Sequence, residues 1–506
     1  MPGTKNNTTI YVASAGTGKT TTLMNLLTET LETTKPKNIC FTTFTKVGAQ
    51  EAIDRALDKN PEYSLKNFEG FSTLHALCYR RIPRKQMLGR EDYKLLSELT
   101  GYSVTGGSAY GNDGLVYNNN AGDRILYYNS LGRNLKVSED EVLNLQIGAK
   151  LTADQLAEFN NFYKEFKIKK NKYDFTDQLE QFLEQDINPN FKTVFVDEAQ
   201  DLSPLQWDVI NYLSKNAETY IAGDDKQSIF KFAGGDPSSL INKKGKRIVL
   251  DTSYRLPSTV LDYAEKIADR IQEKQTYKVK SKNTNGSVQH IHSLAEVDLS
   301  EGTWLLLCRN KVLLSIFEFE LMRKKQLFVS SSSDSLFNEK QIKYILLWEQ
   351  LRRGYKFKAA DLKQLYHEFL PTGSVVKRGS KKLLDEMPDE EMFDKEALID
   401  NFGLRNCEKW NIVFRLPDLT KEVLLKAEKE GKLENSTDVE INTIHATKGR
   451  EADNVVLLPD MTNITYKGML RDEDNEHRVF YVGATRAKKN LYVHVPVTNR
   501  FYKMPR

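Results

Sequence analysis

The sequence is poor in cysteine and lacks long apolar runs, and each absence excludes a class of protein. Its 506 residues include only 4 cysteines, and Cys40, Cys78, Cys308 and Cys407 show no C-x-x-C spacing. Isolated cysteines argue against a zinc site or an iron–sulfur cluster and are typical of reduced thiols. No apolar run approaches the roughly 20 residues that cross a bilayer, and no signal peptide is recognisable. We expect no membrane partner and a cytoplasmic location, associated with the nucleoid, or the host cytoplasm if the protein is viral.

The sequence also lacks a strong charge of either sign. The formal net charge is +4, with 28% charged and 40% hydrophobic residues, which is typical of a globular protein. Its isoelectric point near 8.5 lies below the value of about 9 that marks many nucleic-acid-binding domains. Bulk charge therefore does not establish a nucleic-acid partner. The chain exceeds the length that one hydrophobic core usually serves, so we expect roughly two to four domains.

The segment TIYVASAGTGKTTTLMNLLTETL, residues 9–31, predicts a phosphate-binding loop between a strand and a helix. A β-rich run comes first, small residues follow, and leucines then recur at helical spacing. Gly16 and Gly18 let backbone N–H groups close around phosphates, Lys19 reaches the β- and γ-phosphates, and Thr20 offers its hydroxyl to Mg²⁺. The usual first glycine is Ala13. The expected nucleotide-binding residues of the loop are Ala13, Ser14, Ala15, Gly16, Thr17, Gly18, Lys19, Thr20 and Thr21.

The segment FKTVFVDEAQDLSPLQWDVINYL, residues 191–213, predicts a buried strand at 193–196 that ends in two carboxylates. Asp197 can hold Mg²⁺ together with Thr20, while Glu198 orients and deprotonates water. Ser203 and Pro204 predict the start of a helix. Adjacent acids in a surface turn are usually inert, but their place after an apolar strand favours catalysis.

A guanine-nucleotide enzyme is one alternative, because NKYD at 171–174 matches a guanine-reading tetrapeptide. The match precedes the acidic strand, whereas GTPases place it afterwards. It also lies in the lysine-rich run KEFKIKKNKYDF. We therefore interpret it as a coincidence.

Further segments follow the loop in a recognisable order. Together with the loop, these segments resemble the motifs of superfamily 1 helicases of the UvrD/Rep/PcrA type over nearly the full length, with one motif missing. The resemblance implies an α/β fold with two RecA-like parallel-sheet P-loop domains, two mostly helical inserted accessory domains, and the cofactors ATP and Mg²⁺. The segments are ICFTTFTKVGAQEAIDRA (39–56), GFSTLHALCYRRI (70–82), VDEAQD (196–201), GDDKQSIFKF (223–232), LDTSYRLPS (250–258), INTIHATKGREADNVVLLP (441–459) and RVFYVGATRAKKNLYV (478–493).

Two insertions interrupt these motifs. The Gly/Asn-rich segment 101–123 predicts a loop, the residues after it turn helical, and 335–435 reads as helix-rich. Lysines and aromatics mix in the first insertion, which favours a solvated amphipathic helix over a nucleic-acid contact. The resemblance implies domain 1A at 1–90 and 191–248, 1B at 91–190, 2A at 249–334 and 436–506, and 2B at 335–435. It also implies that replication or repair proteins bind through the 2B insertion.

The resemblance assigns further roles in ATP hydrolysis. Arg255 and Arg486 match the family's two arginine fingers, which stabilise charge on the transferring γ-phosphoryl group. Gln227 matches the residue that contacts the attacking water and the γ-phosphate. Tyr254 matches the ring that stacks on adenine, and Glu451 matches the ribose contact.

Phe230 and Phe232, in AGDDKQSIFKFAGG at 222–235, match the family's base-stacking positions. In an extended segment they would share one face. Stacking a base on an aromatic ring contributes about 1–3 kcal/mol, and a duplex step averages about 1.4 kcal/mol, so such rings can offset lost pairing. Packing of both rings in a core remains an alternative. Other matched nucleic-acid positions are the base-stacking Phe44 and, near the backbone, Thr43, Thr45, Thr73, His75, Thr443, His445 and Lys448.

The chain departs from the family pattern in three places. The glutamine segment that precedes the phosphate loop is missing, Thr21 replaces an arginine after the loop, and Ala233 replaces an arginine of the third motif. Tyr254 is then the main expected contact of the base. Because stacking is tolerant of the base, we expect weak discrimination between ATP and GTP. Loss of the arginine at Ala233 predicts a weaker grip on the strand.

The leading interpretation is an ATP-dependent translocase on single-stranded DNA and a DNA helicase. It would act on single strands and single/double-strand junctions without sequence preference. The QSIF version of the third motif resembles the branch that moves 3′ to 5′. Two alternatives remain: an RNA-directed motor of the same superfamily, and a nucleotide-gated nucleic-acid-binding subunit that unwinds nothing by itself. No appended nuclease or partner-binding tail is expected after Arg506.

Overall fold

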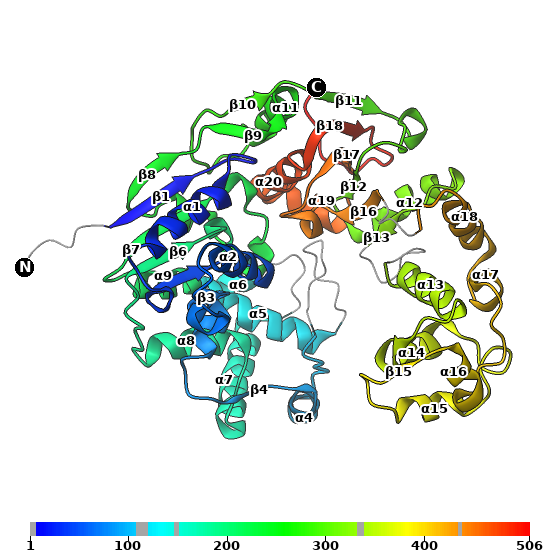
Figure 1. The fold of residues 1–506 in the computed structure, drawn as a ribbon. Coiled ribbons are helices and arrows are strands. Elements are labelled where there is room, and N and C mark those ends of the chain that lie inside the picture. The colour runs from blue at the N-terminus through cyan, green and yellow to red at the C-terminus, as the bar shows by residue number, and fades with distance from the viewer. Residues whose placement is uncertain (1–6, 108–119, 146–150, 331–338, 434–437) are drawn as a thin grey trace, which may run out of the picture. The chain divides into compact units, whose positions relative to one another are not determined.

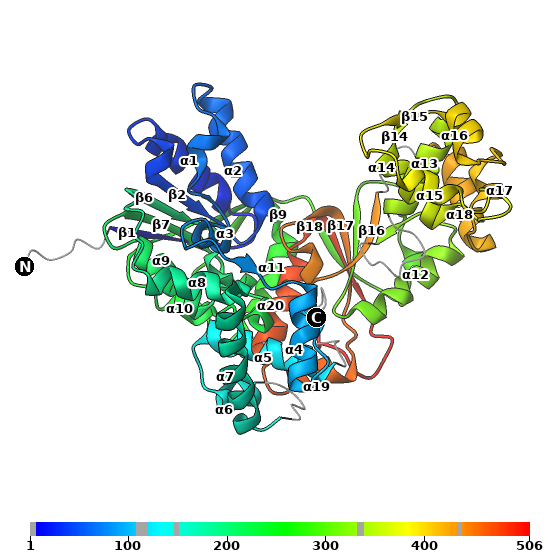
Figure 2. The same cartoon turned by 90° about the horizontal axis from the view of Figure 1, so that it is seen from below.

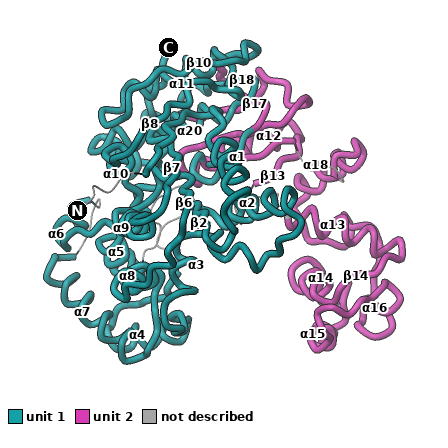
Figure 3. Tube along the Cα trace, turned by 60° about the vertical axis from the view of Figure 1, so that its left-hand side comes forward, with its two compact units in different colours: residues 1–289, 444–451, 459–506 teal, residues 290–443, 452–458 magenta. Residues whose placement is uncertain are grey.

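The computed structural model describes residues 7–107, 120–145, 151–330, 339–433 and 438–506 (Figure 1). These residues form two compact units (Figure 3). Unit 1 comprises 1–289, 444–451 and 459–506, and unit 2 comprises 290–443 and 452–458. Within the described ranges, no helix is both long and apolar enough to span a membrane.

A six-stranded sheet forms the centre of unit 1, with the order β3-β2-β6-β7-β1-β8. Every neighbouring pair in it is parallel. The register sets Val12 opposite Gly223 and Thr42 opposite Val196, so the segments that follow β1, β2, β6 and β7 emerge at the same edge. The strands are β1 Thr8–Val12, β2 Ile39–Thr42, β3 Phe71–Ser72, β6 Thr193–Val196, β7 Glu218–Gly223 and β8 Lys246–Val249.

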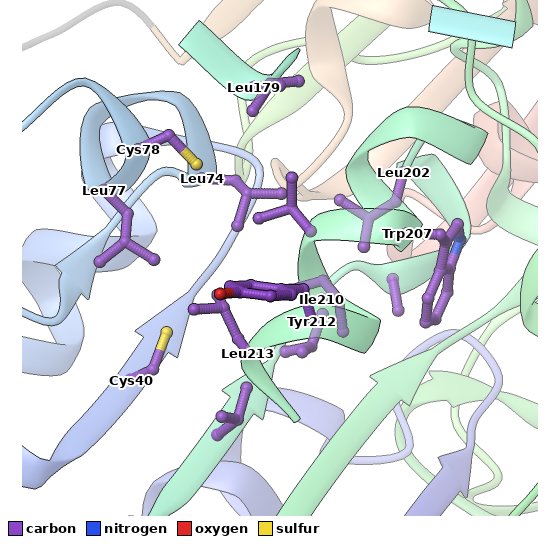
Figure 4. Packing of buried hydrophobic residues seen from close by; sticks show 14 of the residues in the cluster. Cys40, Leu74, Leu77, Cys78, Leu179, Leu202, Trp207, Ile210, Tyr212 and Leu213 are labelled. Carbon is purple, nitrogen blue, oxygen red and sulfur yellow. The ribbon is translucent and has the colours of Figure 1, made fainter. Parts of the chain in front are cut away.

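Both faces of this sheet are buried under helices (Figure 2). Successive side chains of a strand point to opposite faces, and on β6 Phe195 joins the core under α1 and α2 while Val194 and Val196 join the other core. Figure 4 shows part of the second core, where Cys40 and Cys78 lie among leucines and Trp207. The helices are α1 Lys19–Leu31 and α2 Lys46–Lys59 on one face, and α3 Leu74–Tyr79, α8 Phe175–Glu184 and α9 Pro204–Leu213 on the other.

The local predictions around the acidic strand are confirmed. The strand spans Thr193–Val196 and is buried throughout. Helix α9 begins at Pro204, and the Ser203 side chain caps it by accepting a hydrogen bond from the backbone N–H of Gln206. Such a cap satisfies one of the N–H groups that a helix leaves unpaired at its start.

The first insertion has a helical core of its own. Its helices α4 to α7 bury Leu96, Ile125, Leu156 and Phe159 together. The predicted loop at 101–123 is wrong at its end, because Asn120 caps α5 and residues 121–123 are helical. Its residues 108–119 lie outside the described residues. The helices are α4 Arg90–Thr100, α5 Ala121–Leu135, α6 Glu139–Asn144 and α7 Ala153–Lys170.

The NKYD tetrapeptide has a structural role in this insertion. Lys172 and Tyr173 form the short strand β5, and Asp174 caps α8 by accepting from the backbone N–H of Asp177. Asp174 also pairs with Arg133 at 2.8 Å and with Lys167 at 2.6 Å. A carboxylate committed to a buried lysine, a partly buried arginine and a helix cap fits a structural role better than base recognition.

The remainder of unit 1 includes a parallel pair of strands, β9 and β10. Short 3₁₀ helices carry several predicted site residues. The elements are β9 Thr252–Pro257, β10 Lys280–Asn283, β18 Ala487–His494, α10 Pro237–Ile241, α11 Ser258–Ala268, α19 Asn463–Met469, α20 Glu473–Ala484, η3 Ala199–Asp201, η4 Asp225–Gln227, η5 Lys231–Ala233 and η9 His445–Thr447, and the strand β11 Ser287–Ile291 begins in unit 1.

Unit 2 contains the parallel strands β17, β12, β16 and β13, which belong to the second six-stranded sheet. Its strands are β12 Trp304–Cys308, β13 Val329–Ser330, β16 Val439–Thr443 and β17 Ala452–Leu458. The two parallel α/β sheets confirm the predicted fold class, whereas the predicted domain boundaries remain a prediction. The helices are α12 Leu314–Arg323, α13 Glu339–Arg352, α14 Ala359–Gln364, α15 Ser380–Asp385, α16 Lys395–Phe402, α17 Trp410–Val413 and α18 Asp418–Lys429.

Candidate nucleotide and nucleic-acid site

The phosphate loop connects β1 to α1 in unit 1. Gly16 and Gly18 both have positive φ, +74° and +79°, a region that favours glycine. A Cβ at Gly16 would also lie 2.7 Å from the Cβ of Arg255. Glycine at position 16 is therefore required by backbone conformation and by the close approach of β9. Ser253 secures that approach, because its hydroxyl donates to the carbonyl of Ala15 at 3.0 Å.

Two residues of the loop meet the two carboxylates that follow β6. The Lys19 ammonium lies 2.6 Å from Oε2 of Glu198, and the Thr20 hydroxyl donates to Oδ2 of Asp197 at 2.9 Å. Glu198 has φ +53°, ψ +39°, an uncommon conformation for a residue with a side chain, and such strain is concentrated at functional sites. The donor set of Thr20 and Asp197, a hydroxyl and a carboxylate, suits Mg²⁺.

Burial and neighbouring charges separate the pKa values of the two carboxyl groups. Burial opposes ionisation of Glu198, but the charges of Lys19 and Lys448 outweigh it and lower its pKa to about 2. Burial raises the pKa of Asp197, and the charge of Lys19 offsets only part of this increase. An ionised Glu198 can accept a hydrogen bond from water and orient it, while a pKa this low makes the carboxylate a weak proton acceptor as long as Lys19 is paired with it.

Gln227 lies between an arginine and a buried carboxylate. Its Oε1 accepts from Nη2 of Arg486 at 3.0 Å, and its Nε2 donates to Oδ2 of Asp224 at 2.5 Å. Burial, followed by the charge of Asp225, raises the pKa of Asp224 to about 7. Burial and the nearby charge of Arg255 lower the pKa of Arg486 to about 9. The structure therefore brings Gln227 and Arg486 together, as their shared predicted role requires.

Arg255, Glu451 and Tyr254 lie beside the loop on β9 and on the segment after η9. Nη1 of Arg255 lies 2.7 Å from Oε2 of Glu451, and Lys488 pairs with the other carboxylate oxygen at 3.1 Å. The side chain of Tyr254 is 63% exposed, and the Lys282 ammonium lies 4.8 Å from its ring centroid. An exposed aromatic ring beside a phosphate loop can stack on a base.

Four of the predicted nucleic-acid residues form a continuous series of rings, the aromatic row: Phe44, Phe230, Phe232 and His445. Phe44 and Phe230 stack with centroids 5.0 Å apart and planes inclined by 10°. Phe232 meets Phe230 and His445 edge to face at 5.8 and 5.7 Å. Phe44 is exposed, while Phe230 and Phe232 are half-buried, so neither phenylalanine of the third motif is a fully buried core residue.

The conformation predicted for the third motif is wrong. Phe230 and Phe232 were expected in an extended segment, but Lys231–Ala233 forms the 3₁₀ helix η5, and Phe230 has φ −101°, ψ +32°. The turn is fixed by the N–H groups of Ala233 and Gly235, which both donate to the carbonyl of Phe230. The two rings therefore meet edge to face instead of lying along one strand face.

The other predicted nucleic-acid residues have different surroundings. Thr45 caps α2 by accepting from the N–H of Gly48, Thr73 precedes α3 as its N-cap residue, and Thr43 is buried. Burial lowers the pKa of His75 to about 4, so it is neutral at pH 7. Thr443 belongs to unit 2 and is buried.

Lys448 does not face solvent as a residue that contacts the nucleic-acid backbone would. Its ammonium pairs with the carboxylate of Asp201 and donates to the carbonyl of Gln227 at 2.7 Å. It also lies 4.9 Å from the ring centroid of Phe230. Lys448 therefore connects the backbone of Gln227 to the aromatic row.

Two family models match this chain. The UvrD/Rep helicase N-terminal domain matches residues 3–247, and the UvrD-like helicase C-terminal domain matches residues 381–497. The chain is a member of the UvrD/Rep helicase family. Family membership implies the use of ATP, normally with Mg²⁺, which agrees with the donor set of Thr20 and Asp197.

Similar proteins carry helicase names. A probable DNA helicase II homolog of Mycoplasma genitalium is 23% identical, over 96% of this chain and 82% of that protein. The F-box DNA helicase protein 1 of Schizosaccharomyces pombe is 22% identical over 61% of this chain, and the exonuclease/helicase protein RexA of Streptococcus pneumoniae is 27% identical over 27%. This chain spans only 34% and 13% of the lengths of the last two proteins.

The structure of this UvrD/Rep helicase adds residues that the sequence did not single out. Tyr481 shares a hydrogen bond with the Ser14 hydroxyl at 2.8 Å, and the Tyr277 hydroxyl donates to the carbonyl of Ala13 at 2.5 Å. Phe175 is 71% exposed, with its ring 6.3 Å from that of His75. Tyr481 lies within the segment 478–493 that resembles a helicase motif, so the motif could have pointed to it, whereas Tyr277 and Phe175 lie outside every such segment. The tyrosines are distant in sequence from the loop.

The buried carboxyl group of Asp224 predicts a pH dependence of stability. Its folded-state pKa of about 7 lies above the ordinary value of 3.8, so its contribution to stability is complete below about pH 4 and is lost as the pH rises through 7. Asp224→Asn removes this titration. We expect the Tm of the wild type to fall more than that of the variant between pH 5 and pH 8, and a difference on the order of 1 kcal/mol corresponds to about 2–4 °C. Parallel Tm curves in thermal melts would contradict this assignment.

Proposed function

We propose that this UvrD/Rep helicase is an ATP-dependent translocase on single-stranded DNA that unwinds duplexes without sequence preference and moves 3′ to 5′. Lys19 and the loop amides would bind the phosphates, Thr20 and Asp197 would hold Mg²⁺, and Glu198 would act on the attacking water. Gln227 contacts the attacking water and the γ-phosphate, and Arg255 and Arg486 stabilise the charge of the γ-phosphoryl group. The polarity rests on the resemblance of QSIF to the corresponding motif of 3′-to-5′ motors.

One contact supports the coupling of hydrolysis to strand movement. Lys448 bonds to the carbonyl of Gln227 and lies against the ring of Phe230. Gln227 contacts Arg486, and Phe230 stacks on Phe44. A displacement of Gln227 on loss of the γ-phosphate would therefore be transmitted to a base-stacking ring only three residues along the chain. A motor requires such coupling, and so does a nucleotide-gated binding subunit, so strand displacement is the property that separates the two.

The proposed phosphate chemistry predicts that Lys19→Ala and Glu198→Gln abolish strand displacement. Loss of the Lys19 ammonium removes a positive charge that binds the phosphates. Loss of a general base slows hydrolysis by about 10²- to 10⁴-fold. ATP hydrolysis and unwinding of duplexes with 3′ or 5′ single-stranded tails measure both effects. Lys37→Ala, an exposed lysine, serves as the matched control.

These assays also test the alternatives. Unwinding restricted to duplexes with 5′ tails would reverse the proposed polarity, and stimulation by RNA but not by DNA oligonucleotides would identify an RNA motor. Oligonucleotide binding without strand displacement by the wild type would favour the nucleotide-gated subunit.

The aromatic row predicts the effect of Phe232→Ala on strand binding. Loss of one stacking ring should weaken binding of single-stranded DNA by about 1–3 kcal/mol while affinity for ATP stays nearly constant. Fluorescence anisotropy of a labelled oligonucleotide measures the change. Phe319→Ala removes an exposed phenylalanine outside the row and should leave binding unchanged. Equal strand affinities of Phe232→Ala and the wild type would remove Phe232 from the proposed binding surface.

The exposed ring of Tyr254 predicts weak selection of the base. Stacking does not distinguish adenine from guanine by hydrogen bonds, and Thr21 stands where the family often has an arginine. We expect kcat/KM for ATP and GTP to differ by less than about 100-fold, because larger ratios usually need a hydrogen-bonding site for the discriminating group. Tyr254→Ala should lower kcat/KM for both nucleotides by similar factors. A larger preference for ATP would require another residue that reads the base by hydrogen bonds.

A further inference from the structure

Gln200 occupies a central position between the two acidic motifs of unit 1. Its side chain is fully buried, with 0% of its surface exposed. Nε2 of Gln200 donates to Oε2 of Glu198 at 2.5 Å, and its Oε1 accepts from the backbone N–H of Asp224 at 3.0 Å. Both ends of the carboxamide therefore have partners, one in the segment after β6 and the other in the segment after β7.

The partners fix the orientation of this amide. A carboxylate can only accept a hydrogen bond and a backbone N–H can only donate one, so the NH₂ group must face Glu198 and the oxygen must face Asp224. Gly223 permits this approach, because a Cβ there would lie 2.9 Å from Oε1 of Gln200. The hydroxyl of Ser228 holds the Gln200 backbone by donating to its carbonyl at 2.9 Å.

The same logic fixes the orientation of a second amide, that of Gln227. Its NH₂ group faces the carboxylate of Asp224 and its oxygen faces the guanidinium of Arg486. The result is a buried series of hydrogen bonds that runs from Glu198 through Gln200 and Asp224 to Gln227. Satisfied buried networks of this kind hold their members in one geometry.

We infer that Gln200 is a positioning residue for ATP hydrolysis, which sets the carboxylate of Glu198 relative to the segment that carries Gln227. The inference rests on the proposed function, in which Glu198 acts on the attacking water and Gln227 contacts that water and the γ-phosphate. Gln200 itself touches neither the nucleotide nor the reacting atoms in this role. It links the two groups that must converge on one water molecule.

Two substitutions separate the contacts of Gln200, whose Nε2 also donates to Oδ2 of Asp201 at 3.4 Å. Gln200→Ala removes all three side-chain hydrogen bonds. Gln200→Glu retains an acceptor for the N–H of Asp224 and replaces the donor to Glu198 and Asp201 with another carboxylate. Misplacement of a catalytic group by about 1 Å can lower a rate about 100-fold. We therefore expect Gln200→Ala to lower the kcat of DNA-stimulated ATP hydrolysis by about 10- to 100-fold. KM and the equilibrium affinity for a fluorescent ATP analogue should change by less than about threefold, because uniform binding is not affected.

The pH profile distinguishes positioning from a merely structural effect. Two adjacent carboxylates disfavour each other's ionisation and raise the apparent pKa of the pair. Gln200→Glu should therefore shift the acidic limb of the kcat–pH profile to higher pH, and Gln200→Ala should shift it less. Gln178→Ala is the matched control, since Gln178 is another buried glutamine and its Nε2 contacts Sδ of Met87 at 3.2 Å. Its kcat and pH profile should equal those of the wild type.

The results for the Gln200 variants test the positioning role, and the result for the wild type tests the proposed function. If the wild type hydrolyses ATP and Gln200→Ala matches its kcat, or if ATP affinity and kcat fall in parallel, the positioning role is wrong. An unshifted acidic limb in Gln200→Glu contradicts it as well, with Tm values of all variants confirming that they are folded. If the wild type shows no DNA-stimulated hydrolysis, the proposed function itself fails.

Discussion

The concentration of buried negative charge at one edge of the unit 1 sheet is the constraint on which the site depends. Asp197, Asp201 and Asp224 are nearly excluded from solvent, and an ionised carboxylate in such a place is costly unless it is paired. Lys448 pairs with Asp201, and Lys19 pairs with Glu198, the neighbour of Asp197. Their ammonium groups draw together the phosphate loop, the segment after β6 and the segment after η9, so the charge balance also fixes the geometry.

The parallel sheet explains why these groups meet at all. The segments after β1, β6 and β7 leave the same edge of the sheet, and they deliver the phosphate loop, the two carboxylates and Gln227 to one place. Neighbouring acids then have different properties, because the charges of Lys19 and Lys448 outweigh burial at Glu198, whereas burial outweighs the nearby cations at Asp197 and Asp224. The free energy of folding thus holds these carboxylates close together in spite of the repulsion between their charges.

The sequence predicted what depends on local order along the chain. The strand at 193–196, the helix start at Ser203 and the glycine loop all follow from patterns within a few residues, and the structure confirms them. The resemblance to superfamily 1 helicases, which the order of the motifs carries, implied the parallel α/β fold. The roles assigned to individual site residues remain predictions, although the structure brings Lys19 to Glu198 and Gln227 to Arg486.

Features that depend on contacts between distant segments could not be predicted from local sequence patterns. The burial of Lys448 against Asp201 arises from residues 247 positions apart, and sequence placed that lysine near the nucleic-acid backbone. The 3₁₀ turn at Phe230 forms because two backbone N–H groups donate to the carbonyl of Phe230. The spacing of Phe230 and Phe232, two residues apart, did not reveal this turn. Gln200 lies within the motif-like segment VDEAQD, but the sequence assigned it no role, because its partners Glu198 and Asp224 are known only from the structure.

The four thiols differ in their access to solvent, and this difference has practical use. Cys40, Cys78 and Cys308 are buried, whereas Cys407 is only partly covered. Burial also raises the pKa of the Cys40 thiol to about 12, which suppresses the reactive thiolate. A maleimide dye should therefore mark the folded chain at Cys407 before any other position, which provides a built-in attachment point in the helix-rich block for single-molecule observation of the protein.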